Sequence, residues 1–153
     1  MKYLELKIPP LVLMIIFGVL MTLSSVFLPH TLLDQNTTIL VLLVSVIVAL
    51  VFSLSASYSF KKANTTVNPL SPKSTHALVT KGIYQYTRNP MYLGFAICLL
   101  GWVVFLNCPW LLTFVLAFVS YLTRFQIKPE ERILTTLFSN QYTHYQQHVR
   151  RWC

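Results

Sequence analysis

The stretch Thr38-Ile-Leu-Val-Leu-Leu-Val-Ser-Val-Ile-Val-Ala-Leu-Val-Phe-Ser-Leu-Ser-Ala-Ser-Tyr-Ser-Phe60 runs for 23 residues without a charged side chain. A helix needs about 20 predominantly apolar residues to cross the hydrocarbon core of a bilayer. The stretch meets that requirement with residues to spare. We therefore predict a transmembrane helix over about 38–60.

Three further apolar stretches flank this one, at about 11–28, 90–106 and 110–126. The first has 18 residues without a charge, and the other two are at the short limit for a span. Only Asn107, Cys108 and Pro109 separate the last two stretches. A proline inside one long helix would break its hydrogen-bond ladder in the middle of the membrane, so we predict a tight hairpin there and four spans in all.

The composition agrees with an integral membrane protein. Of the 153 residues, 55% are hydrophobic and only 10% are charged, and the mean hydropathy is +0.60. Soluble domains carry about a quarter charged residues. So few charges leave too little polar surface for a water-soluble globule, which argues against an ordinary soluble enzyme and against a disordered chain. We predict an all-α membrane fold that forms a single domain over 1–153.

The basic residues predict the orientation of the spans. The chain has 12 Lys and Arg against 4 Asp and Glu, and Lys and Arg mark cytoplasmic segments. All twelve fall before the first span, between the second and third, or from Arg124 onward, which places both termini in the cytoplasm. They are scattered at span ends without an aromatic platform, so we expect no nucleic-acid partner. The compact chain without targeting tails favours a bacterial inner membrane.

Two segments on the predicted cytoplasmic side, 61–90 and 124–153, hold most of the unusual residues. Prolines and short polar side chains predict an ordered loop in the first segment, with Gly82 in a tight turn. Pro90 suits the first turn of the third span, and Arg88 and Asn89 then lie at the mouth of that helix.

The second segment predicts helices. Glu130 and Glu131 follow Pro129 and are favourable at a helix start, because of the helix macrodipole. Ser139 and Asn140 predict an interruption of this helix. Apolar residues then recur three and four positions apart, which predicts an amphipathic helix on the membrane face: Tyr142, Tyr145, Val149 and Trp152. Arg150 and Arg151 are expected to meet lipid phosphates.

Each polar feature also has a simpler interpretation. Arg88 is explained as a topology determinant, and Glu130 and Glu131 as residues that start a helix. His144 and His148 have a spacing compatible with a metal, but no third ligand follows at a fixed offset, so we expect no metal site. What these interpretations leave unexplained is the combination of an ordered loop, an arginine at a helix mouth and a paired carboxylate on one side.

The combined pattern resembles the isoprenylcysteine carboxyl methyltransferase family, whose relatives include phospholipid N-methyltransferases. The resemblance covers roughly the last 90 residues. It is carried by Leu78-Val-Thr-x-Gly82-x-Tyr84-x-x-x-Arg88-Asn89-Pro90-x-Tyr92-x-Gly94, then by Glu130-Glu131-x-x-Leu134 and Tyr142-x-x-Tyr145. The resemblance implies S-adenosylmethionine as the cofactor, held at the cytoplasmic end of the bundle. No glycine-rich dinucleotide loop is present, which excludes a soluble Rossmann-type methyltransferase.

The resemblance also implies roles for individual residues. Arg88, Glu130 and Glu131 are the predicted catalytic set, in which Glu130 also takes the polar ribose or amino groups of the cofactor. The remaining cofactor-binding residues are predicted to be His76, Ala77, Leu78, Val79, Tyr84, Asn89, Pro90, Met91 and Tyr92.

Three positions depart from the pattern of the family, and the absence of the usual glycine near Ser139-Asn140 implies only a different helix end. The family commonly has histidine where this chain has Asn89, and an amide does not titrate near neutral pH. Proton transfer at Asn89 is therefore not expected. Gln126 aligns with an arginine that handles substrate in the prenylcysteine enzymes, so it is a candidate substrate residue. Because the arginine itself is missing, the resemblance implies methylation of a prenylcysteine carboxylate less strongly than it implies a methyltransferase.

The leading hypothesis is an S-adenosylmethionine-dependent membrane methyltransferase that acts on a lipidic or amphipathic small molecule. Methylation of a phospholipid amine is the alternative within the same class. A non-enzymatic membrane protein, such as a transporter subunit or an assembly factor, is the alternative outside it. Membrane lipids are expected partners, and no obligate protein partner is evident. The sequence leaves open whether the methyl acceptor is a carboxylate, an amine or a thiol.

Overall fold

The computed structural model describes residues 5–31, 33–63 and 77–153, and the described residues form helices without strands. The long α-helices are α1 (Pro10–Ser25), α2 (Gln35–Lys62), α3 (Pro90–Phe105), α4 (Leu112–Leu122) and α5 (Lys128–His148). Short 3-10 turns precede α3 and α4, as η3 (Gly82–Gln85) and η4 (Pro109–Leu111), and a π-helical turn, η5 (Thr123–Ile127), joins α4 to α5. The all-α prediction is confirmed for these residues.

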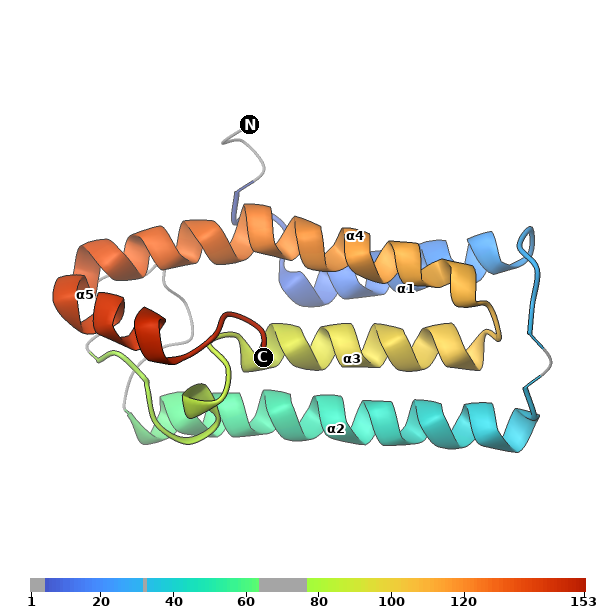
Figure 1. Ribbon diagram of the computed structural model, residues 1–153, viewed down its shortest axis with the longest axis horizontal. Helices are drawn as coiled ribbons and strands as arrows, with labels where there is room; N and C mark the ends of the chain where they lie inside the picture. The colour runs from blue at the N-terminus through green and yellow to red at the C-terminus, as the bar shows by residue number, and fades with distance from the viewer. Residues whose placement is uncertain (1–4, 32, 64–76) are drawn as a thin grey trace.

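The helices α1 to α4 run up and down side by side, with α3 in contact with α1, α2 and α4 (Figure 1). At one end of the bundle, the loop between α1 and α2 is hydrogen-bonded to the loop between α3 and η4. The Thr31 amide donates to the Asn107 carbonyl there at 2.6 Å. The predicted hairpin is present, with Asn107 at a φ of 54° and Pro109 opening the next turn. The other end of the bundle carries the lysines and arginines of the described residues.

Two helices have the length and composition to cross a membrane: Gln35–Lys62, and the continuous helical run Pro109–His148. The helices α1 and α3 are apolar but have only 16 residues each. The first predicted span, 11–28, ends early at Ser25. Pro29 follows shortly after this end. The residue before a proline, here Leu28, is disfavoured in a helix, so the helix ends before it.

Small residues allow α2 and α3 to pack closely. A Cβ added at Gly101 would come within 2.5 Å of Ser45, and one added at Gly94 would come within 3.0 Å of the Ala49 carbonyl oxygen. Such close approach of helix backbones is a frequent basis of packing between apolar helices, where burial of apolar surface from water contributes little. These contacts hold α3 against the middle of α2.

Two clusters of buried side chains form the interior. The larger one lies between α1, α3 and α4 and includes Met21, Leu99 and Phe118. The smaller one lies at the basic end and consists of Ala56, Tyr84, Tyr142 and Tyr145. Large apolar side chains also cover the outside of the bundle: Leu54 of α2 and Leu116 of α4 are 66% and 67% exposed. An apolar outer surface of this kind suits lipid.

Glu130 and Glu131 lie in the first turn of α5 as predicted, but this turn is not a free helix start, because the chain passes from α4 into α5 without leaving the helical conformation. Pro129 lacks the N–H that would bond the Phe125 carbonyl, and the π-helical turn η5 accommodates this defect. The amide of Leu6 donates to the Phe125 carbonyl instead, at 3.0 Å. A proline inside this helix therefore changes its pitch without ending it.

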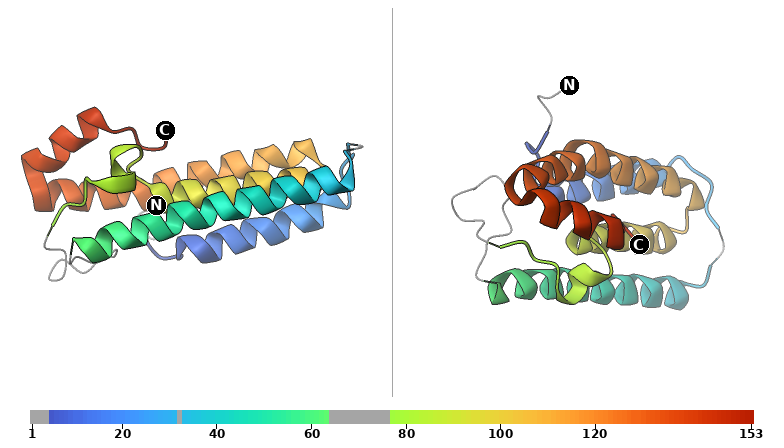
Figure 2. Two further views of the ribbon diagram at one scale, coloured as in Figure 1. Left: turned by 90° about the horizontal axis from the view of Figure 1, so that it is seen from below. Right: turned by 60° about the vertical axis from the view of Figure 1, so that its left-hand side comes forward.

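The predicted interruption at Ser139 is confirmed. Its backbone angles, φ 42° and ψ −115°, are not helical, and α5 bends there. The later part of α5 turns back toward the start of α3, and segment 149–153 follows it, so the chain closes over the basic end of the bundle (Figures 1 and 2).

Candidate functional site

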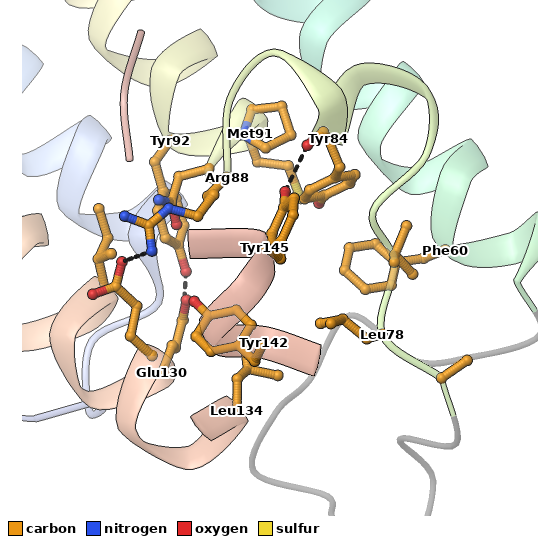
Figure 3. A pocket seen from close by; sticks show the side chains of 16 residues that line it. Phe60, Leu78, Tyr84, Arg88, Met91, Tyr92, Glu130, Leu134, Tyr142 and Tyr145 are labelled. Atoms are coloured by element: carbon orange, nitrogen blue, oxygen red, sulfur yellow. Dashed lines mark hydrogen bonds and ion pairs between the residues drawn. The ribbon is translucent and has the colours of Figure 1, made fainter. Parts of the chain in front are cut away.

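A cavity opens at the basic end, where the end of α2, the chain before α3, the start of α3 and both parts of α5 meet (Figure 3). It encloses about 820 Å³ of space between atoms, including the part open to solvent. Its walls are mostly apolar and aromatic, with a few carboxylate, guanidinium and hydroxyl groups among them. Sites for small molecules and cofactors have this mostly apolar character with a few polar groups.

The structure brings together nearly all of the predicted site residues. The cavity is lined by Ala77, Leu78, Val79, Tyr84, Arg88, Asn89, Pro90, Met91, Tyr92, Glu130 and Glu131. His76 lies outside the described residues. Gln126 is buried in the π-helical turn and is absent from the wall of the cavity. The roles assigned to these residues stay predictions, but their proximity is a property of the fold.

The chain before α3 is held by one glycine and one tyrosine hydroxyl. Gly82 has a φ of +69°, as the predicted tight turn requires, and a Cβ there would also come within 3.0 Å of the Ser59 hydroxyl. The turn carries the buried Tyr84 into the cavity wall. Tyr145 donates its hydroxyl hydrogen to the Tyr84 carbonyl at 2.6 Å, so α5 fixes this turn directly. Burial raises the pKa of the Tyr84 hydroxyl, which keeps it protonated at neutral pH.

The start of α3 follows the predicted pattern, with Pro90 in the first turn and Asn89 at the N-cap. The Asn89 side chain does not cap this helix. It donates instead from Nδ2 to the Arg151 carbonyl at 2.9 Å. The Asn89 amide donates to the Thr87 hydroxyl oxygen at 3.2 Å. The mouth of α3 is therefore organised by the end of the described chain as well as by its own residues.

Glu130 meets Tyr92 in the wall of the cavity. The Tyr92 hydroxyl donates to Glu130 Oε1 at 2.6 Å. Burial disfavours the ionised carboxylate and raises the pKa of Glu130 to about 7; the bond from Tyr92 opposes this shift, and the neighbouring charge of Glu131 adds to it. Both protonation states of Glu130 are therefore accessible near neutral pH, and a nearby cation would favour the ionised one.

Glu131 is the centre of an ion-pair network. Arg88 Nη1 lies 3.0 Å from Glu131 Oε1. Arg151 binds the same carboxylate with two parallel bonds, from Nε to Oε1 at 3.0 Å and from Nη2 to Oε2 at 2.7 Å. The side chains of Arg88 and Glu131 are each only 11% exposed. The two adjacent carboxylates thus have different environments: Glu131 is paired with cations, whereas Glu130 bonds a neutral hydroxyl.

This arrangement suits a ligand with both flat apolar and positively charged parts. Phe60, Tyr84, Tyr142 and Tyr145 supply aromatic surface, and Phe60 and Tyr84 pack edge to face at 5.3 Å between ring centroids. Glu130 supplies a carboxylate that can accept hydrogen bonds from hydroxyl or ammonium groups. Arg88 Nε and Nη1 are buried and have no hydrogen-bond partner among the described residues, although Nη1 is ion-paired with Glu131.

Five residues of the cavity wall were absent from the predicted site: Phe60, Ile127, Leu134, Tyr142 and Tyr145. Leu134 and both tyrosines belong to the quoted sequence pattern, which was a usable signal. Phe60 ends one apolar stretch and Ile127 directly follows another, and nothing in the sequence separates them from their neighbours.

Two expectations about the last segment are corrected. The apolar face with Tyr142 and Tyr145 packs inward against Ala56 and Tyr84, where the expectation placed it on the membrane face. Arg151 binds Glu131 and therefore does not extend toward lipid phosphates. The first error arises because periodicity identifies an apolar face but does not say what covers it. The second arises because the sequence does not show that Glu131 is the partner of Arg151.

Comparison with known proteins identifies relatives. Protein-S-isoprenylcysteine O-methyltransferase B of Arabidopsis thaliana is 40% identical over 77 residues, which are 48% of this chain and 38% of that protein. Protein-S-isoprenylcysteine O-methyltransferase A of the same plant is 31% identical over 110 residues, 70% of this chain and 54% of that protein. An uncharacterized protein of Haemophilus influenzae is 37% identical over 62 residues, 40% of this chain and 98% of that protein.

The chain therefore spans about half or less of the length of these plant relatives. A sequence model described as phospholipid methyltransferase matches residues 37–141, which is more than half of the 153 residues and includes nearly all of α2, the whole of α3 and α4, and most of the cavity wall. The chain belongs to the phospholipid methyltransferase family.

Proposed function

We propose that this protein is an S-adenosylmethionine-dependent methyltransferase that works in a membrane on a lipidic or amphipathic acceptor. The observation that carries the proposal is the cavity at the basic end, where the motif residues before α3 meet Glu130 and Glu131 of α5. Family membership supports the class of reaction, and the relatives named for isoprenylcysteine O-methylation support a lipidic acceptor.

The cavity residues fit S-adenosylmethionine. This cofactor combines a flat adenine, ribose hydroxyls, an ammonium and a sulfonium. The aromatic side chains of Tyr84, Tyr142 and Tyr145 are suited to adenine, and Met91 and Leu78 add apolar surface. Glu130 would accept hydrogen bonds from the ribose or ammonium groups, and a positive ligand would favour its ionised form.

The cofactor, when bound, supplies an activated methyl group for an in-line displacement. The work left to the chain is to align donor and acceptor and to exclude water. In this proposal the hydrogen-bonded mouth of α3 and the bend of α5 at Ser139 would hold the groups that align them. Arg88 and Glu131 support the wall as an ion pair, and Gln126 lies behind it as a candidate contact on the acceptor side.

The proposed setting is a membrane crossed four times, with both termini in the cytoplasm. The lengths of α2 and of the run Pro109–His148 and the exposed apolar surface of α1 to α4 support it. The short α1 and α3 would span with the help of their flanking turns. In this arrangement the basic end and its cavity face the cytoplasm, where the water-soluble cofactor is found, and the acceptor arrives through lipid. The bacterial inner membrane remains our proposed location.

A phospholipid amine is a second candidate acceptor, and one observation favours it. An amine must lose a proton before it is methylated, whereas a carboxylate needs no base. Glu130 lies in the cavity wall, and its ionised carboxylate is a group that can accept such a proton. Identification of the methylated product decides between the two classes.

Equilibrium titration of S-adenosylmethionine into detergent-purified protein tests the proposal. We expect saturable binding by the wild type. Glu130→Gln and Arg88→Ala should each weaken it by about tenfold or more, because each removes a charged group from the cavity wall. Glu5→Gln, which neutralises a carboxylate paired with Arg132 away from the cavity, serves as the control. Absence of wild-type binding, or equal binding by all variants, contradicts the proposal.

A further inference from the structure

Segment 149–152 crosses the mouth of α3 and hydrogen-bonds to it through its backbone. The Arg150 carbonyl accepts a bond from the Arg88 amide at 3.0 Å. The Arg151 carbonyl accepts from Asn89 Nδ2 at 2.9 Å and from the Thr87 hydroxyl at 3.3 Å. Three consecutive residues before α3 are therefore held by two consecutive carbonyls of this segment.

Side chains of the same segment attach it to two other places. Trp152 packs against the larger buried cluster, and its indole N–H donates to the Thr123 hydroxyl oxygen at 3.3 Å. Arg151 forms its two parallel bonds with Glu131. The segment thus connects the mouth of α3, the π-helical turn and the first turn of α5, which all border the cavity.

Arg151 acts on the cavity without being part of its wall. Glu131 and Arg88 line the cavity, and Arg151 does not. Its guanidinium donates to both oxygens of Glu131. Arg88 Nη1 forms an ion pair with Oε1 of the same carboxylate at 3.0 Å. A planar guanidinium sets the orientation of a carboxylate through two parallel bonds, as a lysine ammonium cannot. Without Arg151, Glu131 has a free oxygen and is able to rotate toward Arg88.

We propose that Arg151 is a positioning residue for the cofactor site: it fixes the orientation of Glu131 and, through Glu131, that of Arg88. The backbone of the same segment fixes Arg88 a second time, at its amide. This inference rests on the proposed function, because the site that Arg151 organises is the proposed S-adenosylmethionine site. Its contribution is geometric, so the shape of the side chain matters as well as its charge.

The test compares three variants of the full chain in detergent. Arg151→Gln removes the charge and the fork, and Arg151→Lys keeps the charge without the fork. Arg150→Gln is the matched control, because Arg150 is exposed, carries the same charge one residue away and contributes only its backbone carbonyl. Two quantities are measured: the dissociation constant of S-adenosylmethionine, and amide hydrogen exchange of the peptide over 86–92, which contains the Arg88 amide.

We expect Arg151→Gln to raise the dissociation constant about tenfold and to speed exchange over 86–92, since small displacements of positioning groups have effects of this size or larger. Arg151→Lys should give a smaller but measurable loss of affinity. If only the charge of Arg151 mattered, Arg151→Lys would bind as the wild type does. Arg150→Gln should stay within about twofold of the wild type. If Arg151→Gln does not fold, the Arg151→Lys comparison decides.

The inference is overturned if Arg151→Gln binds S-adenosylmethionine with wild-type affinity, even if exchange over 86–92 increases. Where only Arg151→Lys folds, wild-type affinity in that variant overturns it. Equal losses in Arg151→Gln and Arg150→Gln also overturn it. Failure of the proposed function has a different signature, because it is measured on the wild type alone. A wild type that does not bind S-adenosylmethionine contradicts the function, whereas normal wild-type binding with unaltered variants contradicts only the role of Arg151.

Discussion

Tyr92 and Glu130 are 38 residues apart in the chain, and the hydroxyl of the first donates to Oε1 of the second at 2.6 Å. The bond joins the first turn of α3 to the first turn of α5. It also gives a buried carboxylate a neutral partner, which leaves Glu130 free to respond to a charged ligand. The adjacent Glu131 lacks this freedom, because two arginines hold it.

The first prediction concerns pH. Burial raises the pKa of Glu130 to about 7, so the free protein carries a proton there below this value. A cationic ligand favours the ionised form, and its binding must then release that proton. The affinity for S-adenosylmethionine should therefore decrease as the pH falls below 7. Above pH 7, where Glu130 is already ionised in the free protein, the affinity should become independent of pH.

Calorimetric titrations between pH 5.5 and 7.5, in buffers of different ionisation enthalpy, measure both the affinity and the released proton. Glu130→Gln should abolish the proton release and flatten the profile. A wild-type profile that is already flat, or one that Glu130→Gln leaves unchanged, contradicts the role given to this carboxylate.

The second prediction concerns the contact between α2 and α3. Gly101→Ala places a Cβ 2.5 Å from Ser45, so the helices must separate, and we expect a loss of about 1–3 kcal/mol in stability. Gly18→Ala in α1 is the matched control, because a Cβ there has nothing within 4 Å. Unfolding in mixed micelles measures both variants. Equal stability of the two would show that the close approach of α2 and α3 is not a determinant of the fold.

The third prediction concerns the attachment of α5 to the chain before α3. Tyr145→Phe removes the buried bond to the Tyr84 carbonyl and leaves that carbonyl without its donor. The expected cost is about 1–3 kcal/mol. Tyr58→Phe, at a tyrosine that is 66% exposed, should change stability by less than about 0.5 kcal/mol. If Tyr145→Phe matches this control, α5 is held by other contacts.

The fourth prediction concerns orientation in the membrane. Cys153 is exposed at the basic end, whereas Cys108 is buried in the far turn. In membrane vesicles of known sidedness, an impermeant thiol reagent should label Cys153 only from the cytoplasmic face. His30→Cys in a Cys153→Ser background should react only from the opposite face, because His30 is exposed in the far loop. Labelling of both positions from one face contradicts the four-span arrangement.

The sequence predicted the helices well because apolar runs bounded by prolines and charges leave few alternatives. The run 38–60 lies inside α2, and 90–106 differs from α3 by one residue at its end. The sequence did not predict that the chain continues through Pro129 as a helix. That outcome depends on a π-helical turn and on a bond from Leu6, which is distant in the chain.

The site was predictable where a local pattern marked it, as at Arg88, Asn89 and Glu130. It was not predictable where the contact is between distant parts of the chain. Arg151 is in the sequence one more basic residue near a predicted membrane surface, and only the fold shows that its partner is Glu131. Phe60 lies in the cavity wall and packs against Tyr84, which is distant in the chain, and periodicity carries no such information.

The most direct test of the central claim is transfer of a radiolabelled methyl group from S-adenosylmethionine by the purified protein into a total extract of lipids and amphipathic small molecules. We predict a labelled product that partitions with lipid, that is formed by the wild type and by Glu5→Gln, and that is reduced at least tenfold in Glu130→Gln. The account would be contradicted if the folded wild type labelled no component of the extract. It would also be contradicted if Glu130→Gln labelled the extract as well as the wild type does.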